Sequence, residues 1–235
     1  PRRRRGISSL GRPLAVLADQ LCQGGEVFQG LPAGGLVGLL GGGSLAGVVR
    51  AHMQAKAMRD EGEGDIRMIV GSRLVFRDGT PDLVVYPRDR AGFANLTRLL
   101  TVGNRRAPKG QCWLDFADYL RHADGLQTIL IPTFELGDEP YELGRYLQSI
   151  KQAAGEAWLG APFQFNGEDR RRIRRLKQLA AQTGARLLAT TEPLMHHGDA
   201  RPLLDVVTCI REKKKLNEAG ALLAKNAERQ LKRPQ

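Results

Sequence analysis

The sequence predicts an α/β fold with largely parallel strands. Short segments rich in Ile, Val, Leu and Phe alternate with longer segments whose apolar residues recur at helical spacing. Turn signals rich in Gly, Pro and Asp separate these segments. No internal repeat or low-complexity linker divides the chain, so we expect one domain over residues 44–235, preceded by an arm over residues 1–43.

The first part of this domain is expected to contain a helix and a β-hairpin. Over residues 44–58, Ser44 is a suitable N-cap and the apolar residues that follow lie on one helical face. Residues 66–76 have the composition of a strand, as do residues 82–86. A Gly- and Pro-containing turn signal at 77–81 joins them, so the two strands should pair with each other.

The central part is expected to continue with two helices and a strand. Residues 90–102 fit an amphipathic helix, and a basic loop should follow at 104–110. Residues 115–122 suit a short helix that begins with Asp115 as its cap. Residues 126–131 form a short apolar run closed by a proline, which is typical of a buried strand.

The last part repeats the alternation. Helices are indicated by apolar residues at helical spacing or by a proline at the first helical position. Strands are indicated by short runs rich in residues that favour β-structure. The expected order is helix 139–154, strand 157–163, helix 166–183, strand 186–190, helix 202–213 and helix 217–231.

Residues 1–43 read differently from the rest. Four consecutive arginines are followed by Gly-rich apolar stretches in which no period is sustained. Gly-rich loops can bind phosphate, but neither GxxxxGK[ST] nor a strand followed by GxGxxG is present. A phosphate-binding loop is therefore not favoured, and residues 1–43 are treated as an anomalous Gly/Arg-rich arm.

The composition favours a polyanionic partner. Lys and Arg number 36 against 25 Asp and Glu, which gives a net charge of +11. A basic, Arg-rich proteome would explain the same excess. No apolar run approaches the ~20 residues of a membrane span, so no membrane partner is expected. Cys22, Cys112 and Cys209 are odd in number and far apart, which argues against disulfides and a zinc site and for the cytoplasm.

The C-terminal part of the chain contains Arg201-Pro202-Leu203, Asp205-Val206, Thr208-Cys209-Ile210-Arg211, Glu218-Ala219-Gly220 and Asn226-Ala227-Glu228-Arg229. Together these segments resemble the PHP (polymerase and histidinol phosphatase) domain that opens bacterial DNA polymerases of the polymerase III α-subunit family. The resemblance runs in the family's order from Ser44 onward, and Arg73 and Leu194 point to its error-prone, translesion branch. It implies a distorted (β/α)7 barrel.

The arm over residues 1–43 does not match the opening strand and helix of this family. Natural divergence, a shifted reading frame and a foreign sequence are the three explanations. The abrupt return of the match at Ser44 favours the second. If the arm is non-native, the implied barrel is incomplete at its N-terminal strand and helix.

The metal-binding positions that the resemblance implies are damaged. An active PHP domain gathers His, Asp and Glu at strand ends to hold metal ions, whereas here an expected Asp is Gly41 and an expected acidic residue is Arg73. The Asp-x-His-x-His motif reads EPLMH over 192–196. Only Glu192 and His196 remain as vestigial ligand candidates, and two ligands do not make a catalytic cluster. No catalytic residue, metal or bound cofactor is therefore expected.

Two basic clusters are candidate nucleic-acid contacts. One lies in the basic loop and could instead dock a neighbouring polymerase domain; the other lies on helix 166–183 and could instead be a solvated helix face. No aromatic residue interleaves with the arginines, so base stacking is not indicated. The candidates are Arg105, Arg106, Lys109, Arg170, Arg171, Arg174 and Arg175.

The resemblance implies the N-terminal PHP domain of an error-prone DNA-directed DNA polymerase, a nucleotidyltransferase of DNA damage tolerance, repair and replication. The polymerase palm and its Mg would lie beyond Gln235, so this chain alone would be inactive and structural. Expected partners are DNA, the missing polymerase domains and other translesion-synthesis proteins. The alternatives are a metal-dependent phosphoesterase or 3′–5′ exonuclease and a stand-alone nucleic-acid-binding module.

Overall fold

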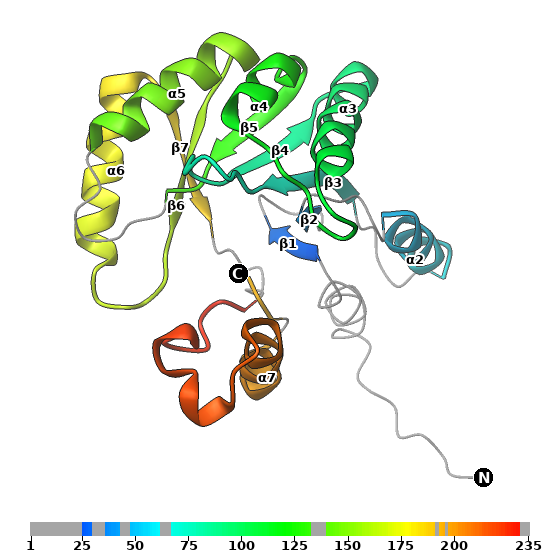
Figure 1. Cartoon of the computed structure of the whole chain (residues 1–235), viewed down its shortest axis with the longest axis vertical. Helices are drawn as coiled ribbons and strands as arrows, with labels where there is room; N and C mark the ends of the chain where they lie inside the picture. The colour runs from blue at the N-terminus through cyan, green and yellow to red at the C-terminus, as the bar shows by residue number, and fades with distance from the viewer. Residues whose placement is uncertain are drawn as a thin grey trace.

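The computed structural model describes residues 25–29, 36–42, 48–61, 67–132, 140–190, 193–195 and 197–230. Within them the chain forms one mixed, open sheet of seven strands that lie in chain order (Figure 1). No pairing between its first and last strands closes the sheet in this part of the chain. The predicted α/β class is confirmed, but a complete (β/α)7 barrel is not seen among the described residues.

The strands are β1 (Gly25–Gln29), β2 (Leu36–Gly42), β3 (Arg67–Leu74), β4 (Leu83–Pro87), β5 (Leu126–Leu130), β6 (Trp158–Pro162) and β7 (Arg186–Thr190). Neighbours β2–β3, β5–β6 and β6–β7 are parallel, whereas β1–β2, β3–β4 and β4–β5 are antiparallel. The prediction of a largely parallel sheet is therefore wrong. The tight turn at 77–81 makes β3 and β4 a hairpin, which is necessarily antiparallel and was itself predicted.

Two of these strands lie in the arm, where the sequence predicts no regular element. β1 and β2 pair with each other, and β2 continues the sheet in parallel register with β3, from Leu36 opposite Arg67 to Gly42 opposite Arg73. Three of the seven residues of β2 are glycines. Glycine has no side chain to contribute to the alternation of apolar and polar residues by which a strand is recognised, so this segment was not predicted as a strand.

Four helices form a layer on one face of the sheet (Figure 1). They are α3 (Arg90–Arg106), α4 (Phe116–His122), α5 (Pro140–Ala154) and α6 (Asp169–Thr183). Each contacts the next, and α3, α5 and α6 also contact the strands beneath them. Helix α2 (Val48–Asp60) contacts β3; its predicted cap, Ser44, lies outside the described residues.

The central strands of the sheet are apolar on both faces. β4 shows this most clearly, because Leu83, Val84 and Val85 are all fully buried and successive strand residues point to opposite faces. Leu83 and Val85 belong to the main core beneath the helix layer, together with residues such as Leu96, Leu99, Leu126, Leu130, Leu147, Ile150, Leu159 and Leu176. Val84 belongs to a second, smaller cluster on the other face, with Ile129, Ile131, Tyr86, Trp158 and Leu188.

Helix α3 extends further than its pattern predicts. The Asp89 carboxylate caps its start by accepting a hydrogen bond from the Gly92 amide at 2.8 Å. The helix continues through Arg105 and Arg106, which were predicted to lie in a loop, and ends at Ala107. Pro108 causes this end, because a residue before proline is pushed out of the helical region.

The C-terminal part follows β7 and lies beyond its end (Figure 1). Helix α7 (Arg201–Glu212) begins with a proline in its first turn, as predicted. The helix predicted over 217–231 is wrong: two single 3₁₀ turns, Leu216–Glu218 and Gly220–Leu222, replace it. Gly220 has a φ of +46°, which an α-helix cannot accommodate.

The residues after these turns run back toward the sheet. The Leu194 amide donates to the Arg229 carbonyl at 2.8 Å, and the Gly198 amide donates to Gln230 Oε1 at 2.6 Å. Asn226 Nδ2 donates to the Gln164 carbonyl at 2.8 Å. These contacts between distant parts of the sequence fix the segment in a non-helical path, which explains why local helical spacing failed to predict it.

Alanine substitutions at two glycines can show how closely α3 approaches the start of β5. A Cβ on Gly92 would lie 2.2 Å from the Gly125 carbonyl oxygen, whereas a Cβ on Gly144 of α5 would meet nothing closer than 3.7 Å. We expect Gly92→Ala to lower the free energy of unfolding by about 2 kcal/mol or more. Gly144→Ala should leave it unchanged or raise it by up to about 1 kcal/mol. Urea denaturation measures both, and a Gly92→Ala variant as stable as the parent chain would contradict this packing.

Candidate nucleic-acid interface

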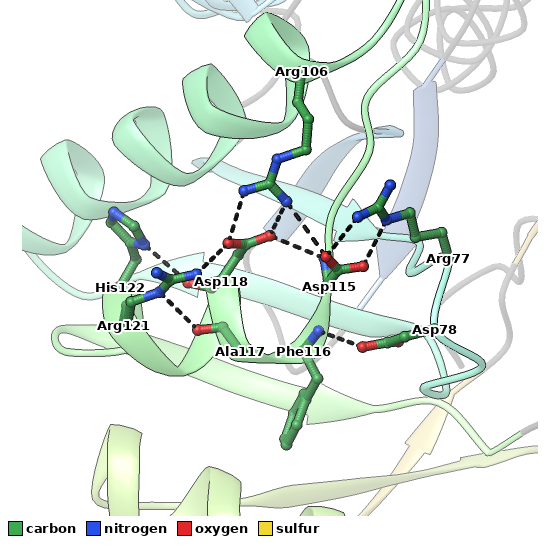
Figure 2. A network of polar contacts seen from close by, with 9 residues as sticks. All are labelled: Arg77, Asp78, Arg106, Asp115, Phe116, Ala117, Asp118, Arg121 and His122. Carbon is green, nitrogen blue, oxygen red and sulfur yellow. Dashed lines mark hydrogen bonds and ion pairs between the residues drawn. The ribbon is translucent and has the colours of Figure 1, made fainter.

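A network of arginines and aspartates joins the β3–β4 turn, the end of α3 and the start of α4 (Figure 2). Its centre is Asp118, whose side chain is only 2% exposed and accepts hydrogen bonds from two guanidinium groups. Arg106 Nη1 lies 2.7 Å and Arg121 Nη2 lies 2.6 Å from its oxygens. The carboxylate also accepts from the Asp115 amide at 3.0 Å, so it caps the helix as well.

The same network fixes the hairpin turn against α4. Arg77 donates from Nε to Asp115 Oδ1 at 2.7 Å and from Nη2 to Oδ2 at 3.0 Å, a two-pronged contact between residues far apart in sequence. Asp78 Oδ2 accepts from the Phe116 amide at 2.8 Å. The turn at 77–81 and the start of α4 are therefore held together by charge-assisted hydrogen bonds.

These contacts keep the two carboxylates ionised. The hydrogen bond from Arg106 lowers the pKa of Asp118 below its usual value, against the opposing effect of burial. The hydrogen bond from Arg77 likewise lowers the pKa of Asp115. Conversely, the pKa of the Arg106 guanidinium is raised by Asp118, so the pair stays charged over the ordinary pH range.

The first basic cluster is divided by this network. Arg106 is committed to Asp118 and lies 3.5 Å from Asp115, so its charge is largely matched within the protein. Arg105 is exposed in the last turn of α3, and Lys109 is exposed in the turn that follows the helix. All three remain candidate nucleic-acid contacts, with Arg105 and Lys109 the more accessible to a phosphate.

The second basic cluster lies on the outer face of α6. Arg170, Arg171, Arg174 and Arg175 are exposed, while Leu176, Leu179 and Ala180 of the same helix are buried. This is the arrangement that helical projection predicts. Within the part of the chain that the structure describes, no ion pair is found for these four arginines. Arg172 differs, since it lies 3.5 Å from the buried Asp169 carboxylate.

Two positions at which the resemblance implies metal ligands lie next to each other in the sheet. In the parallel β2–β3 pair, Gly41 lies opposite Ser72 and Gly42 opposite Arg73, so the two altered positions are neighbours. Gly41 offers no ligand atom, and Arg73 Nε lies 2.7 Å from Asp82 Oδ2. Asp82 is thus engaged by a guanidinium, and neither Gly41 nor Arg73 offers an anionic side chain.

The remaining ligand candidates, Glu192 and His196, lie outside the described residues. Among the residues that the structure does describe, no group of three or more His, Cys, Asp or Glu side chains could hold a metal ion. In the same part of the chain no helix is long and apolar enough to cross a membrane.

One exposed feature beside α6 was missed from the sequence. Phe163 and Phe165 follow β6 and are 41% and 53% exposed, with ring centroids 4.7 Å apart. Their positions immediately before a strongly basic helix could have signalled a surface role, but two phenylalanines after a strand are more often part of a core. No aromatic residue interleaves with the arginines themselves, but two exposed rings precede the helix in the chain.

Comparison with known proteins relates the chain to DNA polymerases. It is 47% identical over 199 residues to the error-prone DNA polymerase of Brucella abortus biovar 1, covering 84% of this chain and 18% of that protein. It is 42% identical over 204 residues to the error-prone DNA polymerase of Bradyrhizobium diazoefficiens, covering 84% of the chain and 17% of that protein. The error-prone DNA polymerase of Caulobacter vibrioides is 40% identical over 203 residues, which cover 85% of the chain.

Homologues named error-prone DNA polymerase thus match most of the chain at substantial identity. The chain spans only 17–18% of the length of these relatives. No family model matches it. The chain is therefore homologous to a part of these polymerases. The relatives carry the name error-prone DNA polymerase, which agrees with the branch of the family that the resemblance indicated.

The network around Asp118 predicts a particular pH dependence. Asp118→Asn removes the charge that two arginines contact and should lower the free energy of unfolding at pH 7 by about 2 kcal/mol. Because folding lowers the pKa of Asp118, its contribution is full above the unfolded-state value near ~3.9 and is lost as pH falls through the lower folded-state pKa. The stability difference between the two proteins should therefore be constant from pH 7 to about 5 and shrink below about 4.

Denaturant titrations at several pH values measure this difference. Asp124→Asn is the matched control, because Asp124 is an exposed aspartate outside the network and should show no comparable loss. A difference for Asp118→Asn that is as large at pH 3 as at pH 7, to within about 0.5 kcal/mol, would show that charge is not the reason for the contact.

Proposed function

We propose that the chain is the PHP-type domain of an error-prone DNA polymerase and that it acts as a metal-free scaffold. It binds the polymerase domains through α7 and contributes positive charge near DNA through α6. The homology to error-prone DNA polymerases supports this role. Nucleotide transfer, with Mg in a palm domain, would belong to the other parts of the parent protein.

The observation that carries the scaffold role is an apolar stripe on α7. Leu203, Val206, Val207 and Ile210 follow the spacing i, i+3, i+4, i+7, so they lie along one side of the helix. They are 59%, 47%, 45% and 71% exposed. A contiguous row of large apolar side chains in water is unusual for a protein that acts alone and marks a surface for another protein.

The stripe is presented outward because α7 is held from its other side. Cys209, which flanks the stripe next to Val206, is only 7% exposed, and Arg201 and Asp205 lie on the side opposite the stripe. Arg201 Nε donates to Asp205 Oδ1 at 2.9 Å, and Arg201 Nη2 donates to the Ala224 carbonyl, which ties α7 to the C-terminal segment. The helix is therefore anchored without using its apolar stripe.

The proposed occupant of this stripe is the polymerase part of the parent protein. The chain corresponds to 17–18% of the length of its relatives, so most of a parent protein of that kind would lie in other domains. Arg211 and the lysines at 213–215 lie at the C-terminal end of the stripe. An apolar partner surface with an acidic rim would complement both features.

The proposal that the domain holds no metal ion is supported by the ion pair between Arg73 and Asp82. This ion pair lies beside the β2 position at which a ligand is expected; the Asp82 carboxylate is engaged by Arg73, and the guanidinium itself has no acceptor atom for a metal. A PHP-type phosphoesterase or exonuclease would need several anionic or imidazole ligands to converge instead.

Metal content tests the metal-free proposal. The purified chain should contain zinc and manganese far below one ion per chain by elemental analysis. Treatment with EDTA should leave its thermal midpoint unchanged, because no metal contributes to the folded state. Tightly bound metal near one ion per chain, removed by EDTA together with a drop in thermal stability, would overturn the proposal and favour the phosphoesterase alternative.

Binding to the rest of a polymerase tests the scaffold proposal. The Caulobacter vibrioides relative without its matching segment is mixed with this chain, and the dissociation constant is measured by calorimetry. The double variant Val206→Ser/Ile210→Ser should weaken binding about tenfold or more. Since both side chains are exposed, its thermal stability should hardly change.

Val75→Ser is the matched control for this measurement. Val75 is 56% exposed but directly follows β3, away from α7 in the chain, and its replacement should not alter binding. If the double variant bound as tightly as the parent chain, the stripe on α7 would not be the docking surface.

A further inference from the structure

The loop between β6 and α6 displays two aromatic rings to solvent. Phe163 and Phe165 are 41% and 53% exposed, and their planes are inclined at 74° in an edge-to-face pair. Phenylalanine side chains that fold into a core bury most of their surface. Two neighbouring rings that remain half in water form an apolar platform beside the C-terminal end of β6.

The backbone of this loop is held in place by two side chains from outside it. Asp169, which is 4% exposed, accepts from the Gln164 amide at 2.9 Å and from the Asn166 amide at 3.3 Å. Asn226 Nδ2 donates to the carbonyls of Gln164 and Phe165 at 2.8 and 3.2 Å. The rings are therefore carried by a fixed loop and not by a freely moving one.

The backbone conformation of Phe165 also indicates that the surrounding structure holds this loop in place. Its φ is +53°, in the left-handed region that residues with a Cβ rarely occupy. Such a conformation persists only when the surrounding structure determines it, as the hydrogen bonds from Asn226 and to Asp169 do here. A glycine would adopt this backbone more easily, so a phenylalanine at 165 indicates that the ring itself has a use.

The platform is followed in the chain by α6, whose outer face is basic. Arg170 and Arg171 stand in the first turn of the helix, and Arg174 and Arg175 follow one turn later. All four are exposed. Aromatic faces next to a track of cations are the combination by which proteins bind single-stranded nucleic acid, because bases stack on the rings and phosphates contact the cations.

We infer that this loop and helix bind single-stranded DNA, with a base stacked on Phe163 or Phe165 and the adjoining phosphates on the arginines of α6. Duplex DNA fits less well, because its bases are already stacked on their neighbours and offer no free face. The inference rests on the proposed DNA-related function and deepens it, since it names the strand state and the part of the nucleotide that is recognised.

The test compares two ligands of equal charge. Fluorescence anisotropy measures binding of the whole chain to a labelled oligothymidylate and to an abasic deoxyribose-phosphate strand of the same length. The parent chain should prefer the oligothymidylate by about 5- to 100-fold, the range expected for one stacked base. Base preference isolates stacking, because both strands present the same phosphates.

Two sets of variants separate the rings from the cations. Phe163→Leu/Phe165→Leu keeps the apolar side chains and the Cβ atoms but removes the aromatic faces, so it should abolish the preference and leave abasic binding unchanged. Arg170→Ala/Arg171→Ala should weaken binding to both strands and reduce the salt dependence by about 0.7 in log–log slope for each phosphate that is no longer neutralised. Thermal midpoints show whether the variants fold, and the single variant Phe163→Leu serves if the double one does not.

Matched controls come from α3. Phe93 is 40% exposed, so Phe93→Leu removes an exposed ring elsewhere; Arg90→Ala/Arg98→Ala removes the same charge as the α6 pair. Neither should alter binding. Equal affinity of the parent chain for the two strands would overturn the stacking inference while leaving phosphate contact by α6 in place. No binding to either strand would overturn both, and the scaffold role would still be decided separately by its own calorimetric assay.

Discussion

The burial of β4 on both of its faces is the constraint on which the rest of the structure depends. Leu83 and Val85 pack under the helix layer, and Val84 packs into the cluster on the opposite face. A strand buried on two sides needs both faces of the sheet to be covered. The helices α3–α6 therefore have their inner faces committed to the core, and only their outer faces can serve function.

Specific charge contacts then set details that burial leaves open. Asp118 joins the end of α3 to the start of α4, and Arg77 joins the β3–β4 turn to the same point (Figure 2). Arg73 with Asp82 occupies a strand end at which the resemblance implies a metal ligand. Where arginines are matched by aspartates they contribute to structure. The apolar stripe of α7 and the four arginines of α6 for which no ion pair is found in the described part of the chain are the surfaces that we propose bind partners.

Local sequence patterns predicted the elements that local forces dominate. The strand at 126–130 and the helix at 169–183 have compact apolar patterns of the right period, and Asp115 was recognised as a cap from its position alone. Features that join distant residues were not predictable in this way. The Arg77–Asp115 contact spans 38 positions, and Asn226 reaches back 61 positions to Phe165, so neither the charge network nor the fixed aromatic loop has a local signature. The helix predicted after residue 217 failed for the same reason.

The central claim is that the working parts of this domain are its outer surfaces and not a metal centre at the strand ends. Hydrogen–deuterium exchange of the whole chain tests this most directly, measured alone, with single-stranded DNA, and with the remainder of a related polymerase. The account predicts that DNA slows exchange over residues 163–175 and that the polymerase remainder slows it over residues 201–212. Slowing confined to the carboxyl ends of β2 and β3, or appearing only when zinc or manganese is added, would contradict it.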